Sequence, residues 1–499
     1  MSFIKKSKRN GKIYLSEVEN KWIDGKCVQK HLRYIGTEVD GKIKLSTSIS
    51  DVEVEEVKVF GPLIVLHHIA NEIGLPRMLG TYASEILSMV YAHCLNYQSI
   101  SHMQDWYRKT DLSLLLNMET VTEKTLLSAL DSLEALDVES LQLEIFKSIN
   151  KKFRLARKCL VYDVTNTYLY GKKCPLAKLG HDKERVKGRP LIQIALAVTQ
   201  DKGLPLFHKT FDGNIHDART LQDVVEMMKK YKIKSGLMIY DRGIISAENV
   251  KNLQKISFDT LCGVPLWEPI KKKIRSIIKK NIITIDNRVK CHKTIFYVTT
   301  ISYTLDSTKG TLAICYNKNK ATSLQESRYD ELQNAIKLLS KKRRIKAGLE
   351  NFFDKKGKFI KNEIARAEEF DGYFCLFSTK VLPKEEMIRL YFDKDVVEKA
   401  FRCLKGITHL RPIRHWLYNR VIAHILICYL SYSLLAVLKQ HLKKLSMSPE
   451  KALQQLESMY KVYMKDTNKK FKIVRIVTLG KIQKDILRAV DAKLLNPSG

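Results

Sequence analysis

The hydrophobic pattern of the chain changes its period near Arg157. From Pro62 to about Asn150, apolar residues recur every three or four positions, which predicts helices. Beyond Arg157, apolar and polar residues alternate, which predicts strands. Three consecutive strands are expected over 159–171, 190–200 and 203–213, followed by a helix over 218–233, a strand over 236–243, a helix over 246–255 and a strand over 258–265.

The predicted order is an antiparallel start followed by two strands that each come after a helix. This is the order of a ribonuclease-H-like fold, so the expected class is α/β. The region that follows is β-rich but irregular and is expected to be an insertion into that core. Helical periodicity returns at Pro383 and continues, with breaks, to the end.

The pattern divides the chain into six regions. These are an N-terminal β-ribbon over 1–58, a helical domain over 59–155, the first part of a ribonuclease-H-like core over 156–265, the β-rich insertion over 266–375, the second part of the core over 376–440, and a C-terminal helical region over 441–499. Asp24 and Gly25 are expected to form the turn of the ribbon. The acidic stretch Asp51–Glu56 separates the ribbon from the helices, and Thr122 is a candidate N-cap for the helix after it.

The net charge points to a polyanionic partner. The chain has 87 Lys and Arg residues against 53 Asp and Glu, which leaves +34. Nucleic acid explains this excess, because each cation set against a phosphate releases condensed counterions. The alternative is the non-specific stickiness of a basic protein.

Cysteine usage and targeting signals predict a cytoplasmic protein that is not secreted. The ten cysteines are scattered, and no C-x-x-C pair is present for a zinc ribbon or a thioredoxin-like motif. The basic N-terminus lacks the apolar core of a signal peptide. The uncharged stretch Val421–Leu438 is at the lower limit for a membrane span and contains His424, Ser431 and Ser433. A buried core helix is therefore expected there, and no membrane partner.

Two aspartates stand in or directly after apolar strands. Asp163 lies in LVYDVTNTY, and Asp241 follows LMIY. An unpaired carboxylate in a core costs several kcal/mol in rough terms, so each needs a reason. Carboxylates on neighbouring strands can share Mg²⁺ or Mn²⁺, which prefer hard oxygen ligands. A strand-end cap, or an ion pair of Asp241 with Arg242, is the alternative for each residue alone.

A third acid is suggested by spacing. If one helix runs through LYFDKDVVEKAFRCLKG, then Tyr391, Lys394, Glu398 and Lys405 share a stripe about 60° wide. A glutamate flanked by cations suits a metal ligand whose neighbours hold phosphates. An exposed face with Glu–Lys pairs, which stabilise only weakly, is the alternative.

Taken together, these residues resemble a known family. Asp163, Asp241 and Glu398, with the last inside Tyr-x2-Lys-x3-Glu-x6-Lys, resemble the DDE transposases of prokaryotic insertion sequences, in the subgroup with the Y-x2-R-x3-E-x6-K signature. The segments YDVTNTYLYG, GRPLIQIALAV, GNIHDARTL, YDRGIIS, VEKAFRCLKG and LRPIRHW are similar to that group as well. The N-terminal KIYLSEVENKW and HLRYIG are similar to the opening of its long members.

The resemblance implies a catalytic core in which Asp163, Asp241 and Glu398 hold two metal ions, Mg²⁺ with Mn²⁺ as a substitute. These ions would serve an in-line displacement at phosphorus. Tyr391, Lys394 and Lys405 match the positions that grip terminal phosphates. Lys394 replaces the arginine of the signature, which keeps the charge but loses the bidentate fork.

Further residues are candidates for DNA binding. Arg189 could contact the backbone or be a solvated turn cation, and Arg242 stands next to an acid of the site. Arg411, Arg414 and Trp416 follow the glutamate helix closely enough to border the site, and Trp416 could stack on a splayed base or anchor the next helix in the core.

Asp217, in GNIHDA, could lie near the metals, but it is also a good N-cap, and the cap is the favoured interpretation.

The function predicted is a DNA transposase that cuts the ends of an insertion sequence and transfers them to target DNA. Its partners would be double-stranded DNA, at terminal inverted repeats and target, and a second copy in a homodimer on DNA. The first 155 residues are expected to supply end binding and dimerisation. A catalytically inactive DNA-binding remnant and a structure-selective nuclease of the same fold are the alternatives.

Overall fold

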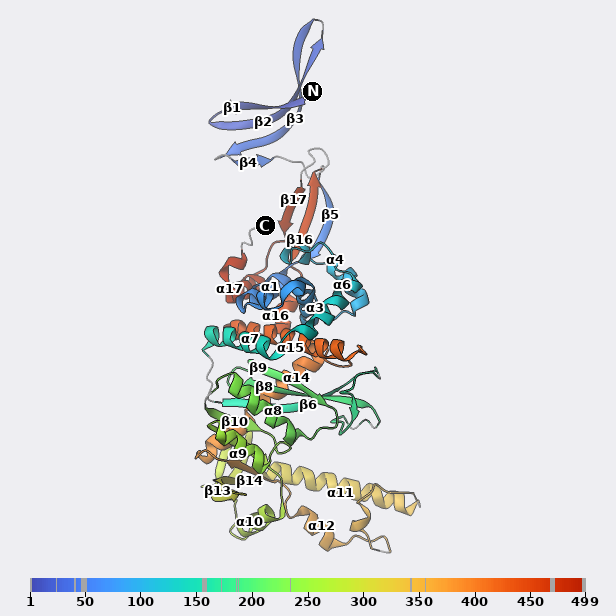
Figure 1. The fold of residues 1–499 in the computed structure, drawn as a ribbon, viewed down its shortest axis with the longest axis vertical. Coiled ribbons are helices and arrows are strands. Elements are labelled where there is room, and N and C mark those ends of the chain that lie inside the picture. Colours follow the sequence, from blue (N-terminus) through green and yellow to red (C-terminus); the bar gives the residue numbers. More distant parts are fainter. Residues whose placement is uncertain are drawn as a thin grey trace. The chain divides into compact units, whose positions relative to one another are not determined.

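The computed structural model describes residues 2–23, 25–39, 42–45, 52–154, 159–171, 173–184, 186, 188–233, 235–341, 343–354, 356–466 and 472–495. The chain forms two compact units. The first consists of Met1–Glu72, Leu87–Leu127 and His441–Gly499, and the second of Ile73–Ile86 and Ser128–Gln440. Figure 1 shows the elements of both units along the chain.

The first unit contains two small antiparallel sheets. One is formed by β1 (Ser2–Arg9), β2 (Lys12–Ile23), β3 (Lys26–Val39) and β4 (Lys42–Leu45) in this order. The predicted ribbon is thus a sheet of four strands. Ile23 pairs with Lys26 across its turn, where Gly25 has a φ of 74°; Asp24 lies outside the described residues.

The second sheet joins the two ends of the chain. β5 (Val52–Val59) pairs with β16 (Tyr460–Asp466), which pairs with β17 (Lys472–Ile476). Val52–Glu56 of the acidic stretch form most of β5, between the ribbon and α1, and Asp51 lies outside the described residues. The C-terminal region contains helices, as predicted, and also these two strands, which the sequence analysis missed.

Helices fill the chain between β5 and the second unit's sheet. They are α1 (Gly61–Glu72), α2 (Leu75–Met78), α3 (Ala83–Leu95), α4 (Met103–Arg108), α5 (Leu112–Leu115), α6 (Glu123–Ser132) and α7 (Val138–Phe153). The first unit also holds α16 (Pro449–Leu456) and α17 (Lys481–Val490). The backbone N–H of Thr125 donates to the Thr122 hydroxyl over 3.2 Å, which confirms the predicted N-cap.

The sheet of the second unit has a ribonuclease-H-like centre. Its central strands are β6 (Cys159–Tyr168), β8 (Pro190–Thr199), β9 (Pro205–Asp212), β10 (Gly236–Tyr240) and β11 (Phe258–Val264), beside the short β7 (Lys178–Leu179). They lie in the order β9-β8-β6-β10-β11. β9, β8 and β6 are antiparallel neighbours, whereas β10 and β11 run parallel to β6. The predicted fold class is confirmed.

The inserted region continues this sheet. β15 (Tyr373–Ser378) pairs antiparallel with β11, and β14 (Thr308–Tyr316), β13 (Thr294–Leu305) and β12 (Arg288–Cys291) follow it in order. The same stretch of chain holds α10 (Glu268–Ile278), α11 (Lys318–Ser340) and α12 (Lys361–Glu368). The insertion thus widens the core sheet, and its predicted bounds stay a prediction.

Helices cover both faces of the sheet. Figure 1 shows α7 and α15 (Tyr418–His441) beside one face and α9 (Ala247–Lys255) beside the other, where it packs against α8 (Asp217–Lys230). α15 is the described helix that is long and apolar enough to cross a membrane, and 94% of its apolar window is buried in the protein. Burial of this extent is what a core helix requires, as predicted for Val421–Leu438.

The segment that carries Glu398 is not one helix. α13 (Lys384–Phe392) ends before Lys394, which is the N-cap of α14 (Asp395–Arg402), and a π-helical turn follows over Cys403–Ile407. The premise of a single stripe on a continuous helix is therefore wrong. Tyr391 contacts Asp241, whereas the charges that act on Lys405 are those of Lys183, Asp163, Asp182 and Arg189.

Candidate active site

Asp163 lies in the middle of β6 and is mostly buried. Its Oδ1 accepts a hydrogen bond from the backbone N–H of Val164 over 2.8 Å. Burial raises the pKa of this carboxyl to about 6, against the pull of the Lys183 and Lys394 charges, and the neighbouring charge of Asp241 adds to the rise. Asp163 is thus a carboxylate in an apolar strand whose charge its surroundings compensate only in part.

Asp241 follows the last residue of β10 and lies beside Asp163. The parallel register pairs Leu237 with Cys159 and Ile239 with Val161, so two further steps bring Asp241 opposite Asp163. The chain turns here, where the Ile244 N–H donates to the Asp241 carbonyl over 3.0 Å, and Asp241 Oδ1 accepts the N–H of Arg242 over 2.8 Å. Asp163, in the middle of β6, and Asp241, directly after β10, therefore lie next to each other on two adjacent parallel strands.

Asp241 is better compensated than Asp163. The hydroxyl of Tyr391 donates to Asp241 Oδ1 over 2.9 Å, and Lys394 Nζ lies 3.6 Å from Asp241 Oδ2. Burial raises the pKa of Asp241, but Lys394, the Arg242 N–H and Tyr391 together outweigh it, and the net pKa is lowered. Gly263 on β11 makes room for this contact, since a Cβ there would lie 2.6 Å from the Tyr391 hydroxyl oxygen.

Glu398 is linked to Asp241 by the same lysine. Lys394 Nζ lies 3.6 Å from Glu398 Oε1 as well, so one ammonium group is shared by both carboxylates. The lysine side chain is 15% exposed, whereas that of Glu398 is 57% exposed. Glu398, the third acid predicted from the sequence, is thus linked to Asp241 because both carboxylates pair with Lys394.

Lys405 lies on the Asp163 side of the site. Burial lowers its pKa to about 8, the charge of Lys183 lowers it further, and Asp163 and Asp182 oppose the shift. Lys183 itself donates to the backbone carbonyl of Val164, directly after Asp163. Lys183 was missed from the sequence, because only the fold brings the loop before β8 back to β6.

Arg189 and Arg411 form ion pairs with acids of the loop before β8. Arg189 donates to Asp182 over 2.7 Å and to Glu184 over 2.6 Å, and its guanidinium stacks 3.8 Å from the Tyr168 ring centre. Arg411 pairs with Glu184. A free turn cation is therefore the wrong interpretation of Arg189, and its contact with DNA stays a prediction.

The segment LRPIRHW borders the carboxyl end of β6. Ile413 forms a parallel bridge with Leu169, and the Ile413 N–H donates to the Tyr168 carbonyl over 3.0 Å. Trp416 is 61% exposed, so the interpretation as a buried anchor is wrong. Arg242 and Arg414 are exposed too, and their roles in DNA binding stay predictions.

Asp217 was assigned to the wrong role. α8 begins at Asp217 with His216 as its N-cap, and neither side chain caps the helix. The Asp217 carboxylate instead lies at the turn after Asp241, 3.6 Å from the place a Cβ on Gly243 would take. Burial raises its pKa, Lys183 and His181 oppose the rise, and Asp241 adds to it. The hydroxyl of Tyr162 donates a hydrogen bond to the Thr220 hydroxyl over 2.7 Å, which holds this end of α8 against β6. No local sequence pattern reveals this long-range contact.

The donor set fits a divalent cation in its chemistry. Asp163, Asp241 and Glu398 offer only carboxylate oxygens, which Mg²⁺ and Mn²⁺ prefer. Among the described residues, no three metal-binding side chains are gathered as a ready ligand group. A lysine ammonium lies between two of the three acids, which shows that this place accepts a cation.

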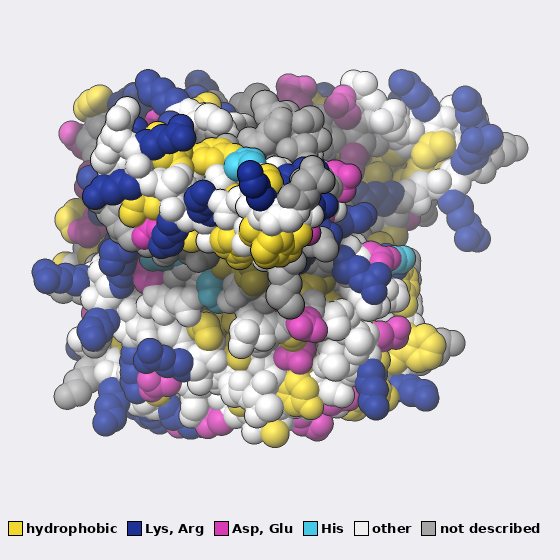
Figure 2. All heavy atoms as spheres, turned by 90° about the horizontal axis from the view of Figure 1, so that it is seen from above, with side chains coloured by type: hydrophobic (Ala, Val, Ile, Leu, Met, Phe, Trp, Pro, Cys, Tyr) yellow, Lys and Arg dark blue, Asp and Glu magenta, His cyan; other side chains and the backbone are white. Residues whose placement is uncertain are grey.

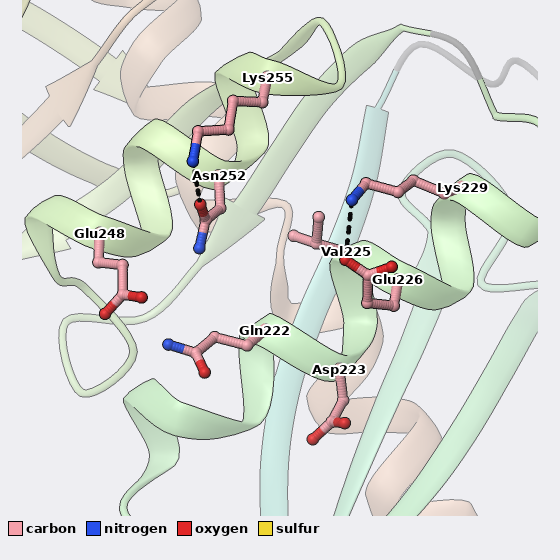
Figure 3. A pocket seen from close by; sticks show the side chains of 8 residues that line it. All are labelled: Gln222, Asp223, Val225, Glu226, Lys229, Glu248, Asn252 and Lys255. Atoms are coloured by element: carbon pink, nitrogen blue, oxygen red, sulfur yellow. Dashed lines mark hydrogen bonds and ion pairs between the residues drawn. The ribbon is translucent and has the colours of Figure 1, made fainter.

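A groove of about 400 Å³ between α8 and α9 lies outside this cluster. It is lined by Gln222, Asp223, Val225, Glu226, Lys229, Glu248, Asn252 and Lys255, and Figure 3 shows Lys229 paired with Glu226 and Lys255 with Asn252. Its three carboxylates outnumber its two lysines, so the groove does not favour an anion. Figure 2 shows Lys and Arg side chains at many separate places on the face that it draws.

Comparisons with known proteins give a family for the larger part of the chain. A family model described as a transposase DDE domain matches residues 154–434. Among solved structures, a cryo-EM structure of piggyBac transposase in a synaptic complex with hairpin DNA is similar, with a TM-score of 0.41 and 12% identity, over 88% of this chain and 82% of that chain. No curated protein matches the chain.

Proposed function

Because the chain belongs to the transposase DDE domain family over residues 154–434, we propose that it is an active transposase of an insertion sequence. It would cut the DNA at the ends of that element and transfer those ends into target DNA. One observation carries the proposal: Asp163 and Asp241 end up side by side on parallel strands, and Glu398 shares Lys394 with Asp241.

Asp163, Asp241 and Glu398 are the residues that would hold the metal. Two divalent ions, Mg²⁺ with Mn²⁺ as a substitute, would supply Lewis-acid charge for an in-line displacement at phosphorus. Tyr391 fixes Oδ1 of Asp241 by its hydrogen bond, and Oδ2, which faces the Lys394 ammonium group, is the oxygen that would bind an ion. The Val164 N–H likewise fixes Oδ1 of Asp163.

Cations around the acids would hold the DNA backbone. Lys405 and Lys183 lie on the Asp163 side, and Lys394 on the other. Arg242, Arg411 and Arg414 are proposed to join them, Arg189 supports the loop at Glu184, and the exposed Trp416 offers a flat face for an unpaired base. Electrostatic attraction of this kind positions a duplex without reading its sequence.

Site-specific end binding is assigned to the regions outside the core. The net charge of +34 supports a duplex DNA partner, in the cytoplasm at the nucleoid. A homodimer on DNA is proposed because two element ends must be processed together.

Cleavage of a donor plasmid that carries the reading frame with its own flanking DNA tests the proposal. Asp163→Asn, Asp241→Asn and Glu398→Gln should each lower end cleavage by about a thousandfold or more, since each removes a group acting in the transition state. Binding of the same DNA in a gel-shift assay should change little.

Asp395→Asn is the matched control, because Asp395 lies on the same helix and pairs at the surface with Lys399 over 2.7 Å. It should leave cleavage intact. A wild-type protein that binds the flanking DNA but never cuts it, with Mg²⁺ or Mn²⁺ present, would instead be an inactive DNA-binding remnant.

A further inference from the structure

We propose that Lys394 is the resident counter-ion of the metal site: its ammonium group takes the place of a divalent ion between Asp241 and Glu398 and leaves when the ion binds. The inference rests on the proposed function, because it takes these carboxylates to be metal ligands. It adds that metal loading and phosphate binding are coupled through one side chain.

The position of the ammonium group carries the inference. Lys394 Nζ is 3.6 Å from Asp241 Oδ2 and 3.6 Å from Glu398 Oε1. Its side chain is 15% exposed, whereas those of Asp241 and Glu398 are 48% and 57% exposed, so the ammonium group is held between two acids that an ion can still reach from solvent. The two acids come from different elements, and Lys394 is the contact that joins them.

Lys394 also differs from the other cations nearby. Its charge acts on Asp163 as well as on Asp241 and Glu398, so it reaches all three proposed ligands. Lys183 reaches Asp163 but is held by the Val164 carbonyl. Lys405 responds to Asp163 and Asp182. Of these three lysines, Lys394 alone stands where an ion would bridge two ligands.

A divalent ion and this ammonium group exclude each other. Mg²⁺ binds carboxylate oxygens at about 2.1 Å, so an ion shared by Asp241 and Glu398 would lie next to the lysine nitrogen and repel it. Lysine has a flexible stem and three rotatable donors, which lets it move away without disturbing the helix. Its ammonium lies 5.3 Å from the Tyr391 ring centre, a surface along which it can turn outward.

The consequence is an ordered loading of the site. Without metal, Lys394 neutralises the acids and keeps α14 on the end of β10. With metal, the released ammonium becomes available to a DNA phosphate beside the reacting bond. A lysine suits this exchange better than the forked guanidinium of the related signature, because it holds the acids as a single point charge.

Mn²⁺ binding to the full-length protein without DNA, measured by electron paramagnetic resonance, tests the inference. Lys394→Gln should bind Mn²⁺ about tenfold more tightly than wild type, because the competing charge is gone. Lys394→Arg keeps the charge and should stay within about threefold of wild type. Lys399→Gln is the matched control on the same helix, since Lys399 is 58% exposed and pairs with Asp395.

Lys183→Gln separates the position from the charge. This substitution also removes a cation that acts on Asp163, but Lys183 does not lie between two ligands. The Mn²⁺ affinity should therefore rise by less than about threefold. Equal gains for Lys183→Gln and Lys394→Gln, or no gain for Lys394→Gln, would overturn the inference. So would an equal gain for Lys394→Arg.

Thermal unfolding supplies a second readout. Metal-free Lys394→Gln should melt below wild type, because Asp241 and Glu398 then repel each other, and Mn²⁺ should raise its midpoint by more than it raises that of wild type. An equal rise in both proteins would count against the inference. Wild-type protein that binds no Mn²⁺ would contradict the metal site of the proposed function itself, whereas binding that Lys394→Gln leaves unchanged would contradict only the counter-ion.

Discussion

Asp163 and Asp241 are the same residue type at matching positions of two neighbouring parallel strands, yet their surroundings move their pKa values in opposite directions. Burial raises the pKa of both carboxyls. Asp241 has Tyr391 at 2.9 Å and Lys394 at 3.6 Å, which outweigh its burial. Asp163 has one backbone N–H and more distant charges, and its pKa rises to about 6.

The difference separates two tasks within one site. Asp241 is held ionised and in place by groups that the sequence motif supplies. Asp163 is held ionised at neutral pH against the preference of its strand, so its charge destabilises the fold until a cation arrives. A residue retained at such a cost is expected to serve function and not stability.

The largest effect on stability is expected from Asp163→Asn. The amide keeps the acceptor for the Val164 N–H and removes the buried charge. At pH 7.5 and without metal, the free energy of unfolding should rise by up to about 3 kcal/mol, from about 1.4 kcal/mol for each pKa unit. Urea unfolding followed by circular dichroism measures it.

Asp241→Asn should change the free energy of unfolding in the opposite direction. Lys394 and Tyr391 lose a charged partner, so the free energy of unfolding should fall, by about 1 kcal/mol or more. The same sign for both variants would contradict the distinction between the two acids.

The gain from Asp163→Asn should depend on pH. The pKa of Asp163 is about 6 in the folded protein and near 3.8 when unfolded, so wild type gains stability from protonation as pH falls through 6. The advantage of the variant should therefore drop to about half at pH 5 and to about a fifth at pH 4. A gain that stays constant from pH 7.5 to 4 would show that burial of the charge is not its cause.

Gly263→Ala should disturb the better-compensated acid from a distance. Its Cβ would lie 2.6 Å from the Tyr391 hydroxyl oxygen, which must move off Asp241. The free energy of unfolding should fall by about 1–2 kcal/mol from crowding and the lost hydrogen bond.

Gly406→Ala, next to Lys405, is the control for this substitution, because a Cβ there meets nothing within 4 Å. Its free energy of unfolding should stay close to that of wild type. If Gly263→Ala and Gly406→Ala lowered the free energy of unfolding equally, crowding of the Tyr391 hydroxyl would not be the cause.

The smallest effect is expected from Lys405→Ala on the Asp163 side. If Lys405 contacts one phosphate, the plot of log binding constant against log salt should become shallower by about one unit. Gel-shift titrations with flanking DNA at several salt concentrations measure this slope. An unchanged slope would place Lys405 outside the DNA interface.

The sequence predicted much of this site because its signals are local. Asp163 and Asp241 stood out as acids in apolar strands, and the order of strands around them led to the correct sheet. The alternation in Val52–Val59 was also visible, but its glutamates led to an interpretation as a separator.

The features of the site that could not be predicted from the sequence depend on the path of the chain and on long-range packing. Tyr391, Glu398 and Lys405 do not form one stripe, because the helix breaks before Lys394 and ends in a π-helical turn. Lys183 and Asp217 reach the acids only through the packing of a loop and a helix end. The sequence fits Trp416 equally well to the core and to the surface, and its 61% exposure in the structure places it at the surface.

Anomalous X-ray diffraction from crystals of the full-length protein soaked in Mn²⁺ tests the central claim most directly. The account predicts anomalous peaks between the middle of β6 and the end of β10, in contact with oxygens of Asp163, Asp241 and Glu398, with Lys394 turned out of its place between the last two. Peaks that leave any of the three acids without an ion, or an occupied site with Lys394 still bridging Asp241 and Glu398, would contradict it.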